Sequence, residues 1–131
     1  MKARPRAFKR RTFRRIPAQS PQPGAGDHHS VYVVLLDPAA ARIRKVLQAN
    51  PARDPKKPIV YVGLTGLTPE ERFTNHKLGI KSSTFVRRFG IRLLPELYEH
   101  LNPMPYEAAA QMEKDLTDDL RRTGYTVVGG H

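Results

Sequence analysis

The stretch from residue 59 to residue 79, IVYVGLTGLTPEERFTNHKLG, constrains the fold of this chain more than any other part of it. Its first six residues alternate in the manner of a β-strand, so Tyr61 and Gly63 fall on the same face. A glycine inside a strand weakens it, and usually marks a bend or a position where another group comes close to the main chain. We therefore expect a phenol and a bare patch of backbone side by side on this strand.

A well-capped helix is expected directly after this strand. Residues 68–71, TPEE, have the form of a capping box with proline at the first helical position, and Gly79 is placed to end the helix. Arg72 and His76 are four residues apart on this helix, so they share a face. Because the turn before the helix is short, this face is expected to look back toward Tyr61.

The preceding segment predicts another strand and a short helix. Residues 31–36, VYVVLL, are the β-branched and aliphatic run typical of a strand buried on both faces, so we expect this strand in the centre of the sheet. Asp37 and Pro38 fit an N-cap and a first helical residue, which predicts a helix to about Gln48. The residues expected to point inward from this helix are Ile43, Val46 and Leu47.

The segment that follows Gly79 predicts a further helix and a third strand. Ser83 is expected to cap a short helix over residues 84–88, which ends at Gly90. Residues 91–94, IRLL, have the composition of a strand. The proline that follows them limits the length of this strand or places it at an edge of the sheet.

The longest helix is predicted over residues 105–122, with Gly124 just beyond its end. Glu113 falls on the flank of the apolar stripe of this helix, where it is neither fully solvated nor enclosed by aliphatic side chains. Residues 125–128 are expected to pack on the sheet as a short apolar tail, and residues 129–131 are expected to fray. The stripe consists of Ala109, Met112, Leu116 and Leu120.

These elements predict a small α/β (α+β) domain over residues 31–131. Its central sheet is expected to have three strands flanked by helices, with a helical insertion between the first two strands. A chain of 131 residues with 39% hydrophobic content can bury one modest core. The absence of cysteine excludes disulfides, thiolate zinc sites and cysteine nucleophiles, so a metal would need oxygen or imidazole ligands.

Residues 1–30 are expected to form a basic, disordered arm and linker, because they are rich in Arg and Pro and show no periodicity. They carry +7 of the net charge of +11. His28 and His29 fall in this linker without a partner at metal-ligand spacing. Because cations that neutralise phosphates release condensed counterions, nucleic acid is the natural partner of the arm. Its expected phosphate contacts are Lys2, Arg4, Arg6, Lys9, Arg10, Arg11, Arg14 and Arg15.

Two alternatives for the arm stay open. A membrane surface or another acidic assembly also attracts such a charge. The lack of acids fits a mitochondrial transit peptide as well, although Pro5 and Pro17 interrupt an amphipathic helix. No apolar run approaches the roughly 20 residues of a membrane span, and the start of the chain has no secretory segment. The expected location is therefore cytoplasmic and nucleoid-associated, with no membrane partner.

The sequence resembles the GIY-YIG nuclease superfamily over roughly residues 31–128, as a stand-alone catalytic domain. The first family signature appears as residues 31–33, VYV, and the second as residues 61–63, YVG. The resemblance implies an endonuclease with one Mg²⁺ or Mn²⁺ ion per site and no small-molecule cofactor. Tyr61 would act as base, Tyr32 and His76 would assist, Arg72 would bind phosphate and Glu113 would hold the ion. The matching positions are Tyr32, Tyr61, Gly63, Arg72, His76 and Glu113.

The same residue types suit phosphodiester hydrolysis on chemical grounds. Water must be deprotonated, and negative charge on the phosphate must be stabilised. A phenol serves as the base only where a cation lowers its pKa from about 10. Arg72 offers a planar fork for phosphate oxygens, and a single carboxylate suits Mg²⁺. Because Glu70 and Glu71 occupy the first helical turn and repel anions, phosphate must be met by Arg72.

Three departures from the family pattern are present. Val31 replaces the first glycine of the pattern, and the connection from Val33 to Tyr61 is longer than in the family and holds a helix. The asparagine that usually follows the last helix is absent, since residues 125–129 contain no amide side chain. This last departure motivates an alternative function, a catalytically degenerate domain that only binds nucleic acid.

The expected function is metal-dependent hydrolysis of DNA phosphodiester bonds. Because the chain has no second folded domain to read sequence, a branched or damaged DNA, as in DNA repair, or a partner protein is expected to direct cleavage. The degenerate nucleic-acid-binding domain is the first alternative. The second alternative is an interaction module that binds a nucleic-acid assembly by contacting protein.

Overall fold

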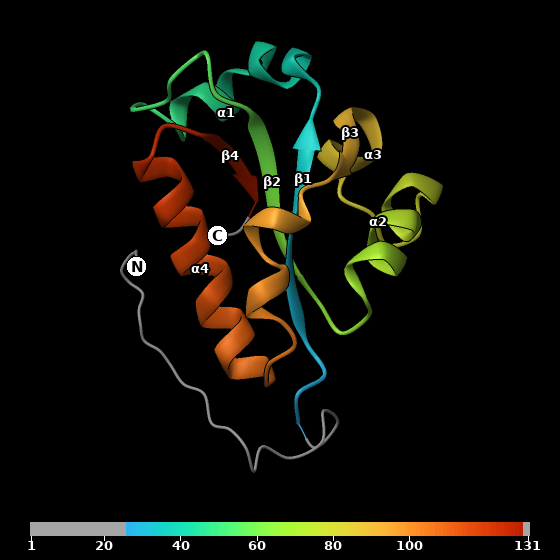
Figure 1. Ribbon diagram of the computed structural model, residues 1–131. Helices are drawn as coiled ribbons and strands as arrows, with labels where there is room; N and C mark the ends of the chain where they lie inside the picture. Colours follow the sequence, from blue (N-terminus) through green and yellow to red (C-terminus); the bar gives the residue numbers. More distant parts are fainter. Residues whose placement is uncertain (1–25, 130–131) are drawn as a thin grey trace.

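Residues 26–129, which the computed structural model describes, fold around one mixed sheet with the strand order β3-β1-β2-β4 (Figure 1). β1 pairs antiparallel with both β2 and β3, whereas β2 and β4 run parallel. The domain is therefore of the α+β class. The strands are β1 (Ser30–Leu36), β2 (Ile59–Thr65), β3 (Gly90–Leu93) and β4 (Thr126–Gly129).

Helices surround this sheet. α2 and α3 contact β1 and β3, while α4 contacts β2, β4 and β1 (Figure 1). None of the helices within residues 26–129 combines the length and the apolar character that crossing a membrane requires. The α-helices are α1 (Arg44–Gln48), α2 (Pro69–Leu78), α3 (Thr84–Phe89) and α4 (Tyr106–Arg122), and the 3-10 helices are η1 (Pro38–Arg42), η2 (Pro95–Leu97) and η3 (Glu99–Leu101).

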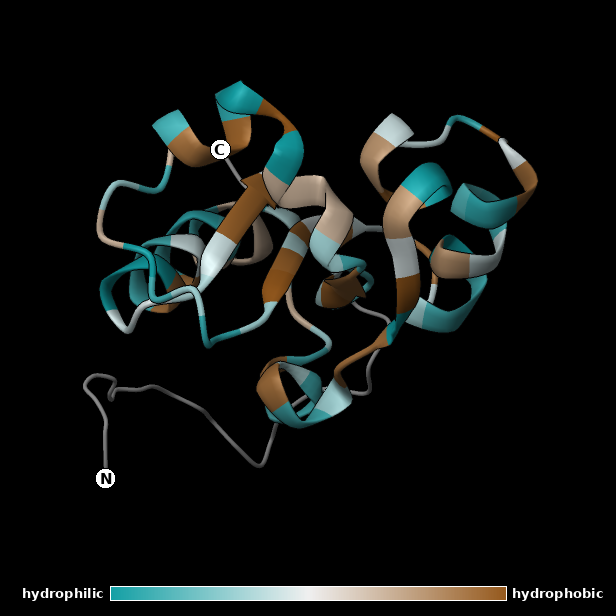
Figure 2. Ribbon diagram, turned by 90° about the horizontal axis from the view of Figure 1, so that it is seen from above, coloured by the Kyte–Doolittle hydropathy of each residue, from teal (hydrophilic) through white to brown (hydrophobic). Residues whose placement is uncertain are grey.

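The core lies on and around β1, as the apolar run of residues 31–36 predicts. Val31, Val33 and Val34 have no exposed surface. Seen from above, the apolar strands lie among helices that carry most of the hydrophilic residues (Figure 2). β3 lies at an edge of the sheet, in agreement with the proline that follows it. The central position of β1 places its side chains between two helical layers and next to β2.

The prediction of three strands was wrong, because the chain returns after α4 to form β4. Residues 125–128 were expected only to pack on the sheet, but Thr126 to Gly129 pair with β2 in parallel register. Gly129 was expected to fray, yet it pairs with Val62. A run of four residues is too short for its periodicity to distinguish a strand from an apolar tail. Residues 130 and 131 lie outside the described part.

The helix predicted from Pro38 to Gln48 is divided into η1 and α1. Ile43 separates them because its backbone is extended, with φ −86° and ψ 119°. This break changes which side chains point inward: Val46 is buried, but Leu47 is 40% exposed. The expected insertion between the first two strands is present, and the inward position of Leu47 was wrong.

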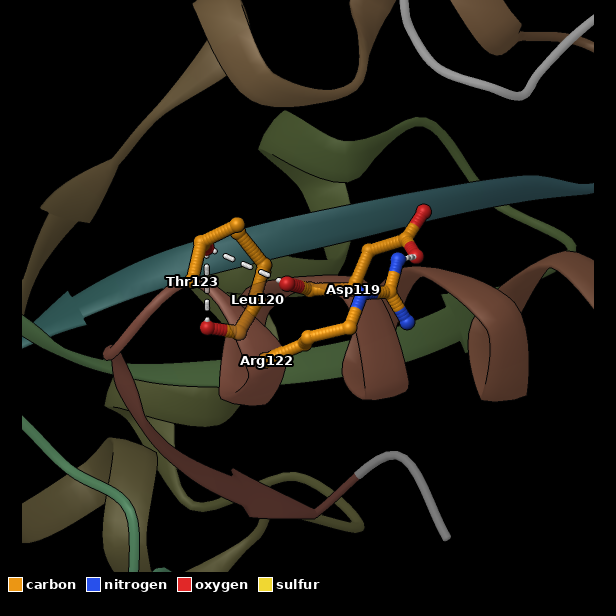
Figure 3. Close-up of polar contacts among 4 residues, drawn as sticks. All are labelled: Asp119, Leu120, Arg122 and Thr123. Atoms are coloured by element: carbon orange, nitrogen blue, oxygen red, sulfur yellow. Dashed lines mark hydrogen bonds and ion pairs between the residues drawn. The ribbon is translucent and has the colours of Figure 1, made fainter.

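The expected ends of α2 are confirmed. Thr68 and Glu71 form the complete capping box, and Gly79 ends the helix with φ +83°. α4 ends in the same way at Gly124, with φ +102°, as its sequence predicts. In addition, the hydroxyl of Thr123 donates to the carbonyl oxygens of Asp119 and Leu120 (Figure 3). Arg122 forms an ion pair with Asp119 one turn earlier. Both ends thus satisfy backbone groups that a helix leaves unpaired.

Two asparagines bind strand backbone with their carboxamides. Asn50, which is 3% exposed, accepts from the N–H of Val127 at 2.8 Å and donates to its carbonyl at 3.0 Å. Asn102 makes the same pair of bonds to Val31, at 2.9 and 2.7 Å. His29, which precedes β1, bridges Met104 through backbone bonds in both directions. His29, which the sequence assigned to the linker, is thus joined to the folded domain.

Candidate functional site

A hydrogen-bonded chain runs from α3 through α2 to the central strand. The backbone N–H of Ser83 donates to Nδ1 of His76 at 2.9 Å. Nε2 of His76 lies 2.8 Å from the hydroxyl oxygen of Tyr32. Because Nδ1 accepts a hydrogen bond, the neutral ring carries its proton on Nε2 and donates it to Tyr32. The imidazole is fully buried, so its tautomer is determined by these two bonds.

Gly63 makes room for Tyr32. The two residues are directly opposite each other in the β1–β2 ladder. A Cβ atom on Gly63 would lie 2.5 Å from both Cζ and the hydroxyl oxygen of Tyr32, well inside van der Waals contact. The side chain of Tyr32 is 1% exposed and cannot retreat from this position without breaking its bond to His76. The glycine of the strand is thus explained by the close approach of a phenol.

Tyr61 completes an aromatic cluster with Tyr32 and His76. Its ring centroid lies 6.1 Å from that of Tyr32 and 5.8 Å from that of His76. Tyr61 is half-buried, whereas the other two side chains are almost completely buried. Its ring also packs on Gly129, where a Cβ would lie 2.7 Å from Cε2 of Tyr61. Tyr61 is therefore the member of the cluster with most access to solvent.

Arg72 lies beside both phenols. Its charge lowers the pKa of Tyr32 and of Tyr61, and it hydrogen-bonds Tyr32. The guanidinium also donates to the backbone carbonyls of Ile80 and Lys81, at 3.3 and 2.7 Å. These bonds hold the planar group at the junction of α2 and α3. The predicted common face of Arg72 and His76 is confirmed, since both reach Tyr32.

Glu113 reaches the same cluster from α4. It is half-buried, as its place on the flank of the apolar stripe predicts. Its negative charge raises the pKa of Tyr61, so the carboxylate lies within electrostatic reach of that phenol. Within residues 26–129 no group of three or more His, Asp or Glu side chains is arranged to enclose a metal ion. Glu113 is the carboxylate of this cluster that an ion could use, and Mg²⁺ commonly keeps several water ligands.

Burial favours the protonated form of both phenols. It is the largest cause of the raised pKa of Tyr32 and of Tyr61. Hydrogen bonds from Ser83 and Tyr32, and the charge of Arg72, act in the opposite direction on Tyr61. Because His76 donates to the oxygen of Tyr32, the hydroxyl proton of Tyr32 remains available to its neighbour Tyr61.

The sequence missed two residues of the site. Ser83 was predicted only as a helix cap, but its side chain makes no cap bond and instead hydrogen-bonds Tyr61. Gly129 was expected to fray, and it supports the ring of Tyr61. Neither could be found from spacing, because both contacts join segments far apart in the chain. The eight predicted phosphate contacts between Lys2 and Arg15 lie outside the described residues.

Comparisons of the chain with protein-family models, with curated proteins and with solved structures found no match. The site therefore has to be interpreted from its own geometry. Six positions predicted from the sequence lie in or around one cluster: Tyr32, Tyr61, Gly63, Arg72, His76 and Glu113.

The buried histidine predicts a specific pH dependence of stability. Burial, and secondarily the charge of Arg72, lowers the pKa of His76 from 6.5 to about 4. Between these two values the unfolded chain binds a proton that the folded protein excludes, so the free energy of unfolding falls as pH decreases through this window. His76→Gln is expected to flatten that decrease in urea titrations at pH 4 to 7. The exposed His100→Gln should not, and equal pH slopes in the His76 variant and the wild type would contradict the assignment.

Proposed function

We propose that this protein is a metal-dependent endonuclease that hydrolyses DNA phosphodiester bonds, in the manner of the GIY-YIG nucleases its sequence resembles. The observation that carries the proposal is the hydrogen bond between Tyr32 and His76, with Tyr61, Arg72 and Glu113 around it. His76, Arg72 and Glu113 are polar groups that lie beside two phenols. Partial burial of such groups costs folding free energy, and clusters of this kind are common in active sites.

The hydrogen-bonded chain supports Tyr61 as the base. His76 donates to Tyr32, which leaves the hydroxyl proton of Tyr32 free to point at the oxygen of Tyr61. An oxygen that accepts such bonds has its anionic form stabilised. Tyr61 is also the phenol with access to solvent. Tyr61 then takes the proton of the attacking water, while Tyr32 and His76 hold the phenol in orientation.

Arg72 supports the binding of the phosphate. Two of its nitrogens are already fixed by the carbonyls of Ile80 and Lys81, so the guanidinium loses little freedom when an anion arrives. Its position next to both phenols places a phosphate oxygen close to the base. The guanidinium stabilises the negative charge that builds on the non-bridging oxygens.

The donor set fits a hard divalent cation at Glu113. A half-buried carboxylate matches Mg²⁺ or Mn²⁺, which retain water ligands and accept phosphate oxygens. The negative charge of Glu113 raises the pKa of Tyr61, and a cation there offsets this effect. When bound, such an ion polarises the phosphate and stabilises the leaving oxygen.

One observation favours a second function, a degenerate domain that binds DNA without cutting it. The last strand presents only Thr126, two valines and Gly129, so no amide reaches Tyr61 from β4. In addition, the pKa of Tyr61 is raised, which makes its phenolate form less available as a base. A domain of this kind would retain binding through its cations alone.

A nicking assay separates the two functions. Wild-type protein is expected to nick supercoiled, branched or damaged DNA with Mg²⁺ or Mn²⁺ and to be inactive in EDTA. Tyr61→Phe removes only the hydroxyl, and loss of a base typically costs 10²–10⁴-fold in rate. Tyr125→Phe is the matched control, because Tyr125 lies outside the cluster next to Lys57. Wild-type protein that binds DNA but nicks none of these substrates with either metal would establish the degenerate domain instead.

A further inference from the structure

We propose that the folded domain has its own DNA-binding surface, formed by Lys81, Arg87, Arg88 and Arg92 and separate from the basic arm. This basic surface lies on the α2–α3 turn, α3 and β3. Its expected occupant is the phosphate backbone of the DNA strand that enters the site. The choice of DNA over other polyanions rests on the proposed function.

The charge of the fold is concentrated in this segment. Residues 72–95 contain six Lys or Arg residues and no Asp or Glu. Residues 31–131 carry +4 in total, so the rest of the domain is net negative. Arg122 on α4 forms an ion pair with Asp119, whereas the segment that carries the basic surface contains no carboxylate of its own. An unneutralised cluster of one sign attracts a polyanion.

Specific contacts hold this segment in place. Nζ of Lys77 donates to the carbonyls of Arg87 and Gly90, at 3.2 and 2.9 Å, and thereby ties α2 to the end of α3. The guanidinium of Arg88 lies 4.8 Å from the centroid of the Phe89 ring. The side chains of the basic surface are nevertheless exposed. Cations on a fixed backbone bind phosphates with a smaller entropic cost than cations on a flexible tail.

The basic surface is continuous with the candidate site. Arg72 binds the carbonyl of Lys81, and His76 accepts the N–H of Ser83, so the α2–α3 turn forms a wall of the site. From this wall the chain continues through α3 to the edge strand β3. α4 itself carries exposed carboxylates, among them Glu107, Asp115 and Asp118, which repel phosphate. A strand that is held at Arg72 is therefore expected to leave across α3 and β3.

Salt-dependent binding tests this surface directly. Affinity of the full chain for a short DNA duplex would be measured by fluorescence anisotropy in EDTA, between about 50 and 200 mM salt. The triple variant Arg87→Ala/Arg88→Ala/Arg92→Ala is expected to lower the slope of log K against log salt by roughly 2 to 3, because each lost phosphate contact removes about 0.9. At the lowest salt its Kd is expected to rise by at least about tenfold.

Two matched variants control for charge and folding. Lys45→Ala/Lys56→Ala/Lys114→Ala removes three exposed charges elsewhere on the domain and is expected to leave the slope almost unchanged. Arginine-to-lysine changes at the three tested positions retain charge and are expected to retain most of the slope. Thermal unfolding identifies any variant that fails to fold. If the alanine variant at the tested positions does not fold, the salt slopes of the lysine variant and of the control are compared with that of the wild type.

Several outcomes would overturn the inference. Equal slope changes in the two alanine triples would show that only net charge matters. If the Arg87/Arg88/Arg92 alanine variant has the wild-type salt slope, the phosphate contacts lie on the arm instead. Binding to phosphatidylserine vesicles that the triple loses, with DNA binding intact, would make the surface a membrane site. Because EDTA prevents cleavage, failure here leaves the endonuclease proposal standing, and absence of nicking leaves the DNA-binding surface standing.

Discussion

Replacing Glu113 with glutamine is expected to lower Mg²⁺-dependent nicking by at least about 100-fold, with little change in DNA affinity. The substitution keeps the shape of the side chain and removes its charge, which is the property that a divalent cation requires. The direction of the effect is informative. Because the charge of Glu113 raises the pKa of Tyr61, its removal alone would make the phenol a more accessible base at neutral pH. Loss of activity would therefore indicate metal binding.

A matched control lies on the same helix. Glu107→Gln changes an exposed residue in the first turn of α4 and is expected to retain activity within about twofold. Isothermal titration with Mn²⁺ would measure ion binding independently of cleavage, and it should show a site that the Glu113 variant lacks. If the Glu113 variant nicks DNA at the wild-type rate, Glu113 is not a metal ligand, whatever the activity of the protein.

Gly63→Ala is expected to destabilise the fold by about 2 to 3 kcal/mol, the upper range for overpacking of a buried site. The added methyl group would lie 2.5 Å from two atoms of a ring that is 1% exposed. Relief of this clash requires the ring of Tyr32 to move, which breaks its bond to His76. We therefore expect loss of nicking together with loss of stability, measured by urea denaturation.

The same substitution three residues later provides the control. At Gly66 a Cβ would come no closer than 3.4 Å to its nearest neighbour, the Nε2 of His29, and the backbone φ is not positive. Gly66→Ala is expected to change the free energy of unfolding by less than about 0.5 kcal/mol. Equal stability of the two alanine variants would mean that Tyr32 does not occupy the space beside Gly63.

Local signals were sufficient to predict most elements and most of the site. The capping box from Thr68 to Glu71 fixes where α2 begins, and the helical period then places Arg72 and His76 on one face. Strand alternation places Tyr61 and Gly63 together in the same way. Each of these predictions depends on residues within a few positions of one another. These predictions agree with the structure because the tertiary contacts favour the same conformations as the local sequence.

Long-range pairing explains what could not be predicted. β4 has only four residues, and its partner β2 lies more than 60 positions earlier in the chain. The role of Ser83 depends on the packing of the α2–α3 turn near Tyr61, which no pattern in its own segment encodes. Ile43 interrupts a helix whose composition is continuous, and no pattern in the segment marks this break. In each case distant contacts decided between local alternatives.

The carboxamides of Asn50 and Asn102 have a consequence for self-association. A carboxamide has the donor and the acceptor of one peptide group, so each asparagine takes the place of one residue of an absent strand. Asn50 occupies the outer edge of β4 at Val127, and Asn102 occupies β1 at Val31, beyond the end of the shorter β3. A second molecule that adds a strand at either position must first displace an amide that is already hydrogen-bonded to the strand. The sheet can therefore remain small and partly open without pairing edge to edge.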